Sequence, residues 1–277
     1  MAALQVKIAC VGLVGESVFL EVPGFHVGEE TVTACAMFKE PGGKGFNQAV
    51  AAARAGARVS FLGATGSDRY ADSIRAFCGE ERISFDLPQK EGRTAYAVIM
   101  TDRQGRNHVT VYRGAELEIK DAERFFPKIA EADLLLLNNE VPNEINCACA
   151  EIAARNGTPI IMDPAPRRPI PEALKERVWL FTPNEYEAQE LTEQDNCIVT
   201  LGRKGCLIKS CDLVVPAVDV VPIDTTGAGD TFTGVLSVLL AEGLPLTDAV
   251  KTATKAASIT VTRRGAAGAI PYRAEYL

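Results

Sequence analysis

The sequence is poor in the residues that build metal centres, disulfide frameworks and membrane spans. Its 277 residues include only two histidines, His26 and His108, and one tryptophan. The eight cysteines are scattered and form no C-x-x-C pair, which argues against a zinc site and favours small buried thiols in a reducing cytoplasm. No apolar run approaches the roughly 18 residues that a membrane helix needs. Residues 1–15 carry Lys7 within a short apolar run, which predicts a first strand and no signal peptide.

Positive charge is also scarce. The chain has 29 lysines and arginines against 36 aspartates and glutamates, so its formal net charge is −7. No basic tract interrupts that balance, and nucleic acid or an anionic membrane is therefore a poor candidate partner. A hydrophobic content of 47% is enough for a full core. At about 100–200 residues per domain, the length allows one large α/β domain or two small ones.

Short apolar runs alternate with segments of helical period along most of the chain. Continuous apolar runs are typical of strands buried on both faces, so the pattern predicts a three-layer α/β/α fold around a mostly parallel sheet. The predicted strands are 6–11, 59–62, 134–137, 159–162, 178–181 and 198–201, and the predicted helices are 47–55, 68–80 and 144–156. Gly56 and Gly157 follow two of these helices, where a left-handed residue is expected.

Two regions depart from this alternation. Residues 29–37 and 94–112 alternate as half-exposed antiparallel strands do, with a turn at 102–105. We interpret them as a small β-sheet lid, with strands contributed by about 13–40 and 93–115; an ordinary edge hairpin is the alternative. No linker or internal repeat marks a boundary, so one domain over 1–277 is the economical prediction.

The first glycine-rich cluster is PGGKGFNQA at 41–49, directly before an alanine-rich helix. Its glycines let the backbone approach a ligand closely, and the helix N-terminus supplies free N–H groups. Lys44 and Asn47 add donors, a set that suits a hydroxyl-rich small molecule; a tight turn capped by Asn47 is the alternative. The cluster is not a Walker A loop, because glycine follows Lys44 where serine or threonine is required.

The second cluster is DTTGAGDTF at 224–232, at the start of a long predicted helix. Glycines at a helix start expose N–H groups beside the positive end of the dipole, which makes an anion hole. Asp230 lies there too, and a carboxylate that merely caps the helix is the alternative. A dinucleotide-binding fingerprint fits less well, because Phe232 occupies its third glycine position.

Together, the two clusters resemble the signatures of the ribokinase-like (PfkB) carbohydrate kinases, and within that family the ribokinases. DPAP at 163–166, TPNEYE at 182–187, TLGRKG at 200–205 and VTRRGA at 261–266 follow in the family's order. The resemblance covers nearly the whole chain. It implies a ribokinase-like fold and an ATP-dependent sugar kinase, with ribose as the first substrate to test. The alternatives are a kinase of the family for another sugar or a nucleoside, and a non-catalytic sugar- or nucleotide-binding relative.

The resemblance also implies roles for individual residues. Asp230 matches the base that takes the hydroxyl proton, and the N–H groups of Gly227, Ala228 and Gly229 match the anion hole. The matching sugar-binding positions are Gly42, Gly43, Lys44, Asn47, Glu140 and Asp230. The matching nucleotide-binding positions are Asn184, Glu187, Thr200, Leu201, Gly202, Gly205, Gly229 and Thr254. Asn184 and Glu187 would share one face of a helix near the phosphates and Mg²⁺; a solvated helix face is the alternative.

The implied cofactors are ATP and Mg²⁺, with K⁺ as a candidate third. Its matching backbone positions are Asp224, Thr226, Thr260, Arg263, Gly265 and Ala269. The expected partners are a small-molecule sugar and ATP, without nucleic acid or membrane, and a homodimer through the lid is a further candidate. The expected compartment is the cytoplasm.

Two departures from the ribokinase pattern bear on the substrate and on stability. Ribokinases usually carry Asn-x-Asp after the first strand, where both side chains contact ribose; here Gly15-Glu16-Ser17 stands in its place. We therefore expect ribose to be a poor substrate and a different or bulkier polyol to use the room left by Gly15. The second departure is 192–197, a predicted turn where the family has a longer loop and a helix.

Overall fold

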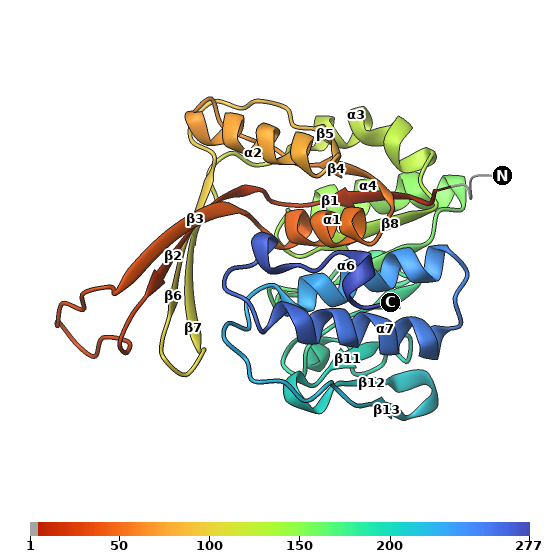
Figure 1. The fold of residues 1–277 in the computed structure, drawn as a ribbon. Coiled ribbons are helices and arrows are strands. Elements are labelled where there is room, and N and C mark those ends of the chain that lie inside the picture. Colours follow the sequence, from red (N-terminus) through yellow and green to blue (C-terminus); the bar gives the residue numbers. More distant parts are fainter. Residues whose placement is uncertain (1–4) are drawn as a thin grey trace.

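Six parallel strands form the central sheet of the computed structural model, which describes residues 5–277 (Figure 1). Their order is β10-β9-β8-β1-β4-β5. The strands are β1 (Lys7–Val11), β4 (Arg58–Leu62), β5 (Ser84–Asp86), β8 (Leu134–Asn138), β9 (Ile160–Asp163) and β10 (Leu180–Phe181). Every residue of β8 and β9 is buried, which explains why these strands are apolar without alternation up to their last residues, Asn138 and Asp163.

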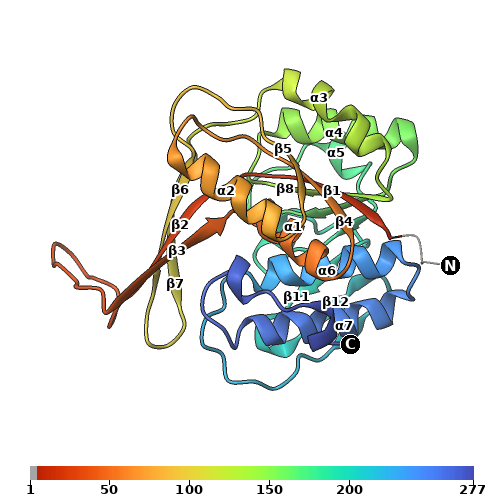
Figure 2. The ribbon, with the colours of Figure 1, turned by 45° about the horizontal axis from the view of Figure 1, so that its top comes forward.

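Helices cover both faces of this sheet, so the predicted three-layer fold is confirmed (Figures 1 and 2). One face packs against α1 (Lys44–Arg54), α2 (Arg69–Glu80), α6 (Ala228–Ala241) and α7 (Leu246–Thr260). The other packs against α3 (Ile119–Ala130), α4 (Asn143–Asn156) and α5 (Glu172–Lys175). Side chains of one strand alternate between the two cores: Ile8 and Cys10 lie in the first, and Ala9 and Val11 in the second.

The lid is a second sheet with the order β3-β2-β6-β7, and it projects from the main body in both views (Figures 1 and 2). Its strands are β2 (Gly15–Glu21), β3 (Ala36–Gly42), β6 (Ala95–Thr101) and β7 (Asn107–Tyr112). The predicted turn at 102–105 joins β6 to β7 and is confirmed. The predicted strand at 29–37 is wrong, because β3 begins only at Ala36 and the preceding residues form a loop.

A third, antiparallel sheet contains β11 (Ile198–Thr200), β12 (Cys206–Ile208) and β13 (Leu213–Val215). The predicted strand at 198–201 exists, but it pairs with β12 in this antiparallel sheet and not with a strand of the central parallel sheet, so that part of the prediction is wrong. Two parallel bridges, Phe181–Cys197 and Asn184–Thr200, still keep β11 beside β10 and the residues that follow it. Residues 192–197 contain no helix, as predicted, and lead directly into β11.

The predicted helices are found with boundaries that differ by at most three residues. The helix predicted at 47–55 begins at Lys44, and Asp68 is the N-cap of α2. Gly56 (φ +105°) and Gly157 (φ +71°) follow their helices with left-handed backbone, as expected. Of the predicted N-terminal segment, residues 1–4 lie outside the described residues. Within 5–277, no helix combines the length and apolar character needed to cross a bilayer.

Candidate active site

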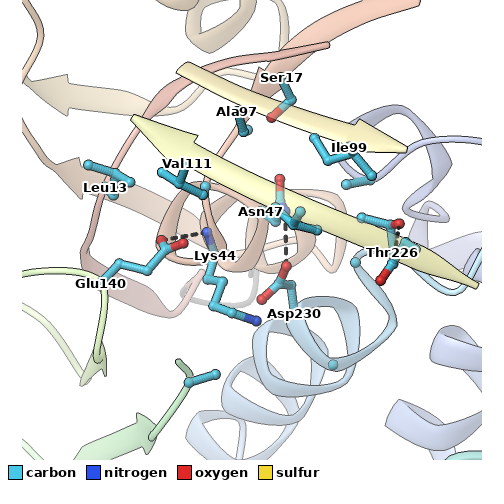
Figure 3. A pocket seen from close by; sticks show the side chains of 18 of the residues that line it. Leu13, Ser17, Lys44, Asn47, Ala97, Ile99, Val111, Glu140, Thr226 and Asp230 are labelled. Atoms are coloured by element: carbon cyan, nitrogen blue, oxygen red, sulfur yellow. Dashed lines mark hydrogen bonds between the residues drawn. The ribbon is translucent and has the colours of Figure 1, made fainter. Parts of the chain in front are cut away.

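A cleft of about 470 Å³ lies between the lid and the carboxyl ends of the central strands. Residues just past these strands line its floor, which is where parallel α/β sheets usually bind ligands. They are Leu13 after β1, Glu140 after β8, Asp163 at the end of β9 and Thr182 after β10. The lid side of the cleft is mostly apolar (Figure 3). The side chains that the lid contributes are Ser17, Phe19, Ala95, Tyr96, Ala97, Ile99, Asn107, Val109 and Val111.

Asp230 lies at the floor of the cleft, in the first turn of α6. Its Oδ2 accepts a hydrogen bond from Nδ2 of Asn47 at 2.9 Å (Figure 3). Its Oδ1 lies 3.4 Å from Nε2 of Gln48. Gly234 makes this approach of α1 and α6 feasible, because a Cβ there would lie 2.5 Å from the carbonyl oxygen of Gln48. The two predicted glycine clusters thus meet through the helices that they begin.

Lys44 lies beside Asp230, and carboxylates surround its side chain. Burial alone would lower the pKa of this ammonium, but Asp230, Asp163 and Glu140 outweigh burial and hold it above its ordinary value. The backbone N–H of Lys44 also donates to Oε2 of Glu140 at 2.7 Å (Figure 3). The Lys44 ammonium is therefore a positive charge that several carboxylates of the cleft share.

Burial raises the pKa of each of these acids. Burial raises the pKa of Asp163 to about 8 and that of Glu140 to about 7, although Lys44 opposes both shifts. Burial also raises the pKa of Asp230, against Lys44 and the hydrogen bonds from Asn47 and Gln48. A carboxylate with a raised pKa is a better proton acceptor near neutral pH.

Unpaired backbone amides lie next to Asp230. Gly227, the N-cap of α6, has left-handed backbone (φ +77°), which turns the chain into the helix. Within residues 5–277 the N–H groups of Gly227 and Gly229 have no acceptor, while that of Ala228 lies 3.5 Å from the carbonyl oxygen of Thr225. Gly227 and Gly229 line the cleft, whereas Ala228 does not. Such free amides at a helix start attract an anion.

The predicted Asn184–Glu187 pair lies at the cleft but not on a helix face. Asn184 precedes a 3-10 turn (Glu187–Glu190), and its Oδ1 accepts the backbone N–H of Glu187 at 2.9 Å. Oε2 of Glu187 in turn accepts the backbone N–H of Asn184 at 2.9 Å. The helix prediction is wrong because these reciprocal bonds close a tight turn. Thr200 faces the same part of the cleft.

Four predicted nucleotide-binding residues lie outside the lining of the cleft: Leu201, Gly202, Gly205 and Thr254. Gly205 (φ +98°) has a structural reason to be glycine, because a Cβ there would lie 2.0 Å from the carbonyl oxygen of Val215. The hydroxyl of Thr254 donates to the Val250 carbonyl within α7.

The candidate K⁺ residues gather beside the start of α6. Asp224 is buried, and its carboxylate accepts the N–H groups of Thr226 (2.9 Å) and Gly265 (3.1 Å). Nη1 of Arg263 lies 3.5 Å from the Ala269 carbonyl oxygen. The Thr260 hydroxyl pairs with that of Thr231 and lies deeper in the core. No residue within 5–277 forms an ion pair with Asp224, and a buried carboxylate of this kind suits a nearby cation.

Gly15 and Ser17 both line the cleft, but the space expected at Gly15 is absent. A Cβ at Gly15 would lie 2.2 Å from the carbonyl oxygen of Ala95, its partner on β6. The expectation that a bulkier substrate uses this room is therefore wrong. Ser17 faces the cleft beside Gly42, where a Cβ would lie 2.3 Å from its hydroxyl oxygen.

Sequence reasoning missed Gln48, Asp163 and Asn107 as site residues. The first two belong to motifs already noted, at 41–49 and 163–166, and their positions next to Asp230 and Lys44 follow only from the fold. Gln48 joins the two acids, because its Nε2 also donates to Oδ2 of Asp163 at 2.8 Å. Asn107 carries no sequence signal; it reaches from the lid to the Thr226 hydroxyl at 3.0 Å.

Comparison with known proteins identifies the family. Residues 5–273 match the pfkB family of carbohydrate kinases. This chain belongs to that family. It is 35% identical over 265 residues to the ribokinase of Bacillus subtilis, an alignment that covers 89% of each chain.

Two solved ribokinase structures resemble this pfkB-family kinase along nearly its whole length. The ribokinase from Thermotoga maritima matches with a TM-score of 0.85 and 34% identity, over 99% of this chain and 98% of the other. The Arabidopsis thaliana ribokinase, solved in complex with ribose and ATP, matches with a TM-score of 0.84 and 26% identity over 99% and 98%. The ribokinase-like fold is thereby confirmed, and the chain is a carbohydrate kinase.

Proposed function

We propose that this kinase transfers the γ-phosphoryl group of ATP to a hydroxyl of a sugar, with ribose as the first substrate to test. The position of Asp230 carries the proposal. It is a buried carboxylate next to unpaired amides at the floor of a lid-covered cleft. The relative that binds ribose and ATP in its solved structure supports the same substrates.

Asp230 acts as the general base in this proposal. The sugar hydroxyl gives its proton to the carboxylate while its oxygen attacks the γ-phosphorus and the bond to ADP breaks. Asn47 already donates to Oδ2, so Oδ1 is the oxygen that takes the proton, since within residues 5–277 its only donor is Gln48 at 3.4 Å. The amides of Gly227 and Gly229 receive the charge that spreads over the transferred group.

The glycines at the start of α1 bring the sugar against backbone. Gly42 and Gly43 both line the cleft with backbone. Gly43 must be glycine for the fold itself, because its φ is +120° and a Cβ there would lie 2.3 Å from the Leu13 carbonyl oxygen. Next to this surface, Lys44 offers a charged donor and Glu140 a carboxylate acceptor, both at the cleft. Donors and acceptors in one place suit a polyol, whose hydroxyls do both.

The carboxylate side chains that line the cleft suit a Mg²⁺ ion bound together with ATP. No three His, Cys, Asp or Glu side chains of the described chain gather as a metal site, so an ion here would bind largely to phosphate oxygens. Mg²⁺ commonly takes one or two carboxylates plus substrate phosphates and waters, and Glu187 and Asp163 are two of the carboxylates that line the cleft. Bound Mg²⁺ would neutralise the phosphate oxygens. Glu187 would hold it through Oε1, because Oε2 accepts the Asn184 amide.

A K⁺ ion fits beside Asp224 for a similar reason. The carboxylate is buried with only neutral donors around it, and Thr226, Gly265 and Ala269 lie close by. We propose that their carbonyl oxygens hold the ion, with Arg263 and Thr260 completing the set. The ion would balance the buried charge next to the anion hole.

Ser17 favours a second candidate substrate class, another sugar or a nucleoside. It supplies one small hydroxyl where ribokinases place an acid, and the lid side chains around it are apolar. A substrate with fewer hydroxyls facing the lid would lose less than ribose loses at this point.

We also propose that the lid and the main body form one domain and that two copies associate through the lid. The outer strands β3 and β7 carry exposed Met37 and Tyr112, and unpaired strand edges commonly pair with another chain. The cytoplasm is the proposed compartment, because all eight cysteines are free thiols and five of them are buried.

ADP release across a panel of sugars and nucleosides, with Mg²⁺ and ATP saturating, tests the proposed reaction. We expect release with at least one sugar, and loss of it when Mg²⁺ is chelated. Release with nucleosides alone would replace the sugar by the second candidate. Saturable ATP binding without turnover on any member of the panel would refute the kinase activity and leave a binding protein.

A further inference from the structure

Glu40 connects the lid to the C-terminal part of the chain. The residue lies on β3, just before the glycine loop that begins α1. Its Oε1 accepts the backbone N–H of Ala266 at 2.5 Å, and its Oε2 accepts that of Gly268 at 2.8 Å. One lid carboxylate thus holds two amides of a segment that lies 226 and 228 positions further along the chain. The segment runs beside β3 in the fold (Figure 1).

The segment leaves room for this carboxylate and for little else. A Cβ at Gly265 would lie 2.9 Å from Oε1 of Glu40, and one at Gly268 would lie 2.8 Å from Oε2. Between the two glycines, Ala266 packs with Phe19 in the apolar cluster of the lid. The Glu40 carboxylate can therefore occupy this position only because residues 265 and 268 have no side chain.

The same segment forms one wall of the loop that precedes α6. A Cβ at Gly227 would lie 3.1 Å from Cα of Ala266, so the N-cap of α6 packs directly on the segment. The backbone N–H of Gly265 donates to Oδ2 of Asp224 at 3.1 Å. The 224–227 loop therefore packs on the 265–268 segment, and that segment is in turn bound by Glu40 of the lid.

We propose that Glu40 is a positioning residue for phosphoryl transfer, which keeps the 265–268 segment against the 224–227 loop and so couples the lid to the anion hole. This inference rests on the proposed function, because it places Glu40 within that reaction. Hydrogen bonds to a carboxylate are stronger than neutral ones, so the pair of them resists displacement of the segment. A misplacement of about 1 Å at a reacting group costs about 10²-fold in rate, so a small shift of the Gly227 amide is enough to slow the reaction.

A second contact between the lid and this segment supplies a matched control. Glu21 on β2 pairs with Arg264 at 2.9 Å, and the Arg264 side chain is 64% exposed. Exposed ion pairs contribute little, and neither residue lines the cleft. Glu21→Gln therefore removes a lid carboxylate next to the same segment without touching the bonds to Ala266 and Gly268.

The experiment compares wild type with Glu40→Ala, Glu40→Gln, Gly268→Ala and Glu21→Gln. The readouts are kcat, KM for sugar and ATP, and hydrogen–deuterium exchange of peptides that cover 224–231. We expect Glu40→Ala to lower kcat by about tenfold to a hundredfold with little change in the KM for sugar, and to speed exchange at 224–231. Gly268→Ala should act in the same direction because its methyl group displaces Oε2 of Glu40. Glu40→Gln should be intermediate, and Glu21→Gln should match wild type.

Unchanged kcat and unchanged exchange at 224–231 in Glu40→Ala would overturn the proposal, as would equal effects in Glu21→Gln. If Glu40→Ala does not fold, Glu40→Gln and Gly268→Ala make the same comparison. Exchange needs no turnover, so a wild type that transfers no phosphoryl group would refute the proposed function while exchange at 224–231 still decides the role of Glu40.

Discussion

Replacing Asp230 by asparagine separates chemistry from structure at this site. The new side chain has the same shape, and its amide nitrogen has acceptors available. Oδ1 of Asn47 and Oε1 of Gln48 are both buried without a hydrogen-bond partner. A flip of either side-chain amide would exchange the nitrogen that now faces Asp230 for that oxygen. Asp230→Asn also removes a carboxyl group that is costly to ionise in this site, because burial raises its pKa. We therefore expect the variant to fold with a free energy of unfolding equal to that of wild type or slightly higher.

The expected loss of activity is large by comparison. General-base catalysis contributes about 10²–10⁴-fold, which is about 2.7–5.4 kcal/mol at about 1.36 kcal/mol for each factor of ten. ATP binding should change little, because Asp230 bonds to Asn47 and Gln48 and not to the unpaired amides of Gly227 and Gly229. The fall should therefore appear in kcat at saturating ATP.

Three measurements decide this prediction: steady-state ADP release, titration with a non-hydrolysable ATP analogue, and urea unfolding. Asp248→Asn is the control, since Asp248 also lies in the first turn of its helix, α7, but forms an exposed pair with Lys251. It should match wild type in all three. A kcat in Asp230→Asn above about a tenth of the wild-type value would remove Asp230 from the role of base.

The remaining predictions concern K⁺, the buried carboxyl group of Asp163 and the hydroxyl of Ser17. K⁺ should raise kcat above the value in Na⁺ at equal ionic strength, and identical rates in the two salts would count against the ion site at Asp224. The folded pKa of Asp163, about 8, lies above the value of about 3.9 for an unfolded aspartate, so the folded state binds more protons between these values and stability falls as pH rises through them. Urea unfolding from pH 5 to 8 should show this fall in wild type and a flatter profile in Asp163→Asn; equal slopes would contradict it. Ser17→Asp should raise kcat/KM for ribose by about 10–150-fold, the value of one hydrogen bond to a charged group, and no gain would mean that the cleft recognises ribose through other groups.

Long, continuous signals made the body of the fold predictable. β1, β8 and β9 are apolar except for one terminal residue each, because both faces of these strands are buried, and that pattern can be recognised without knowledge of the neighbouring strands. β12 and β13 have three residues each, which is too short for any period to show. The error at 29–37 has a related cause: alternation also occurs in a loop, and only pairing with β2 shows that β3 starts at Ala36.

The candidate site was predictable where its residues lie close together in sequence. Asp230 and the amides before it belong to one helix start, and Lys44 and Asn47 belong to another, so each set has a local reason to be noticed. Glu40 and Asn107 have none, because their partners Ala266 and Thr226 are more than one hundred positions away. Contacts between the lid and the body follow from tertiary packing alone.

The substrate question turns on Ser17 once the neighbouring residues are placed. Gly15 cannot exchange for a larger residue without separating β2 from β6, since a Cβ there would lie 2.2 Å from the Ala95 carbonyl oxygen. Glu16 cannot replace the missing acid, because it pairs with Lys39 at 3.1 Å and does not line the cleft. Neither neighbour compensates for the short side chain at position 17. On β2, discrimination between ribose and other polyols therefore depends on the Ser17 hydroxyl, and the other polar side chains of the lid that line the cleft are Tyr96 and Asn107.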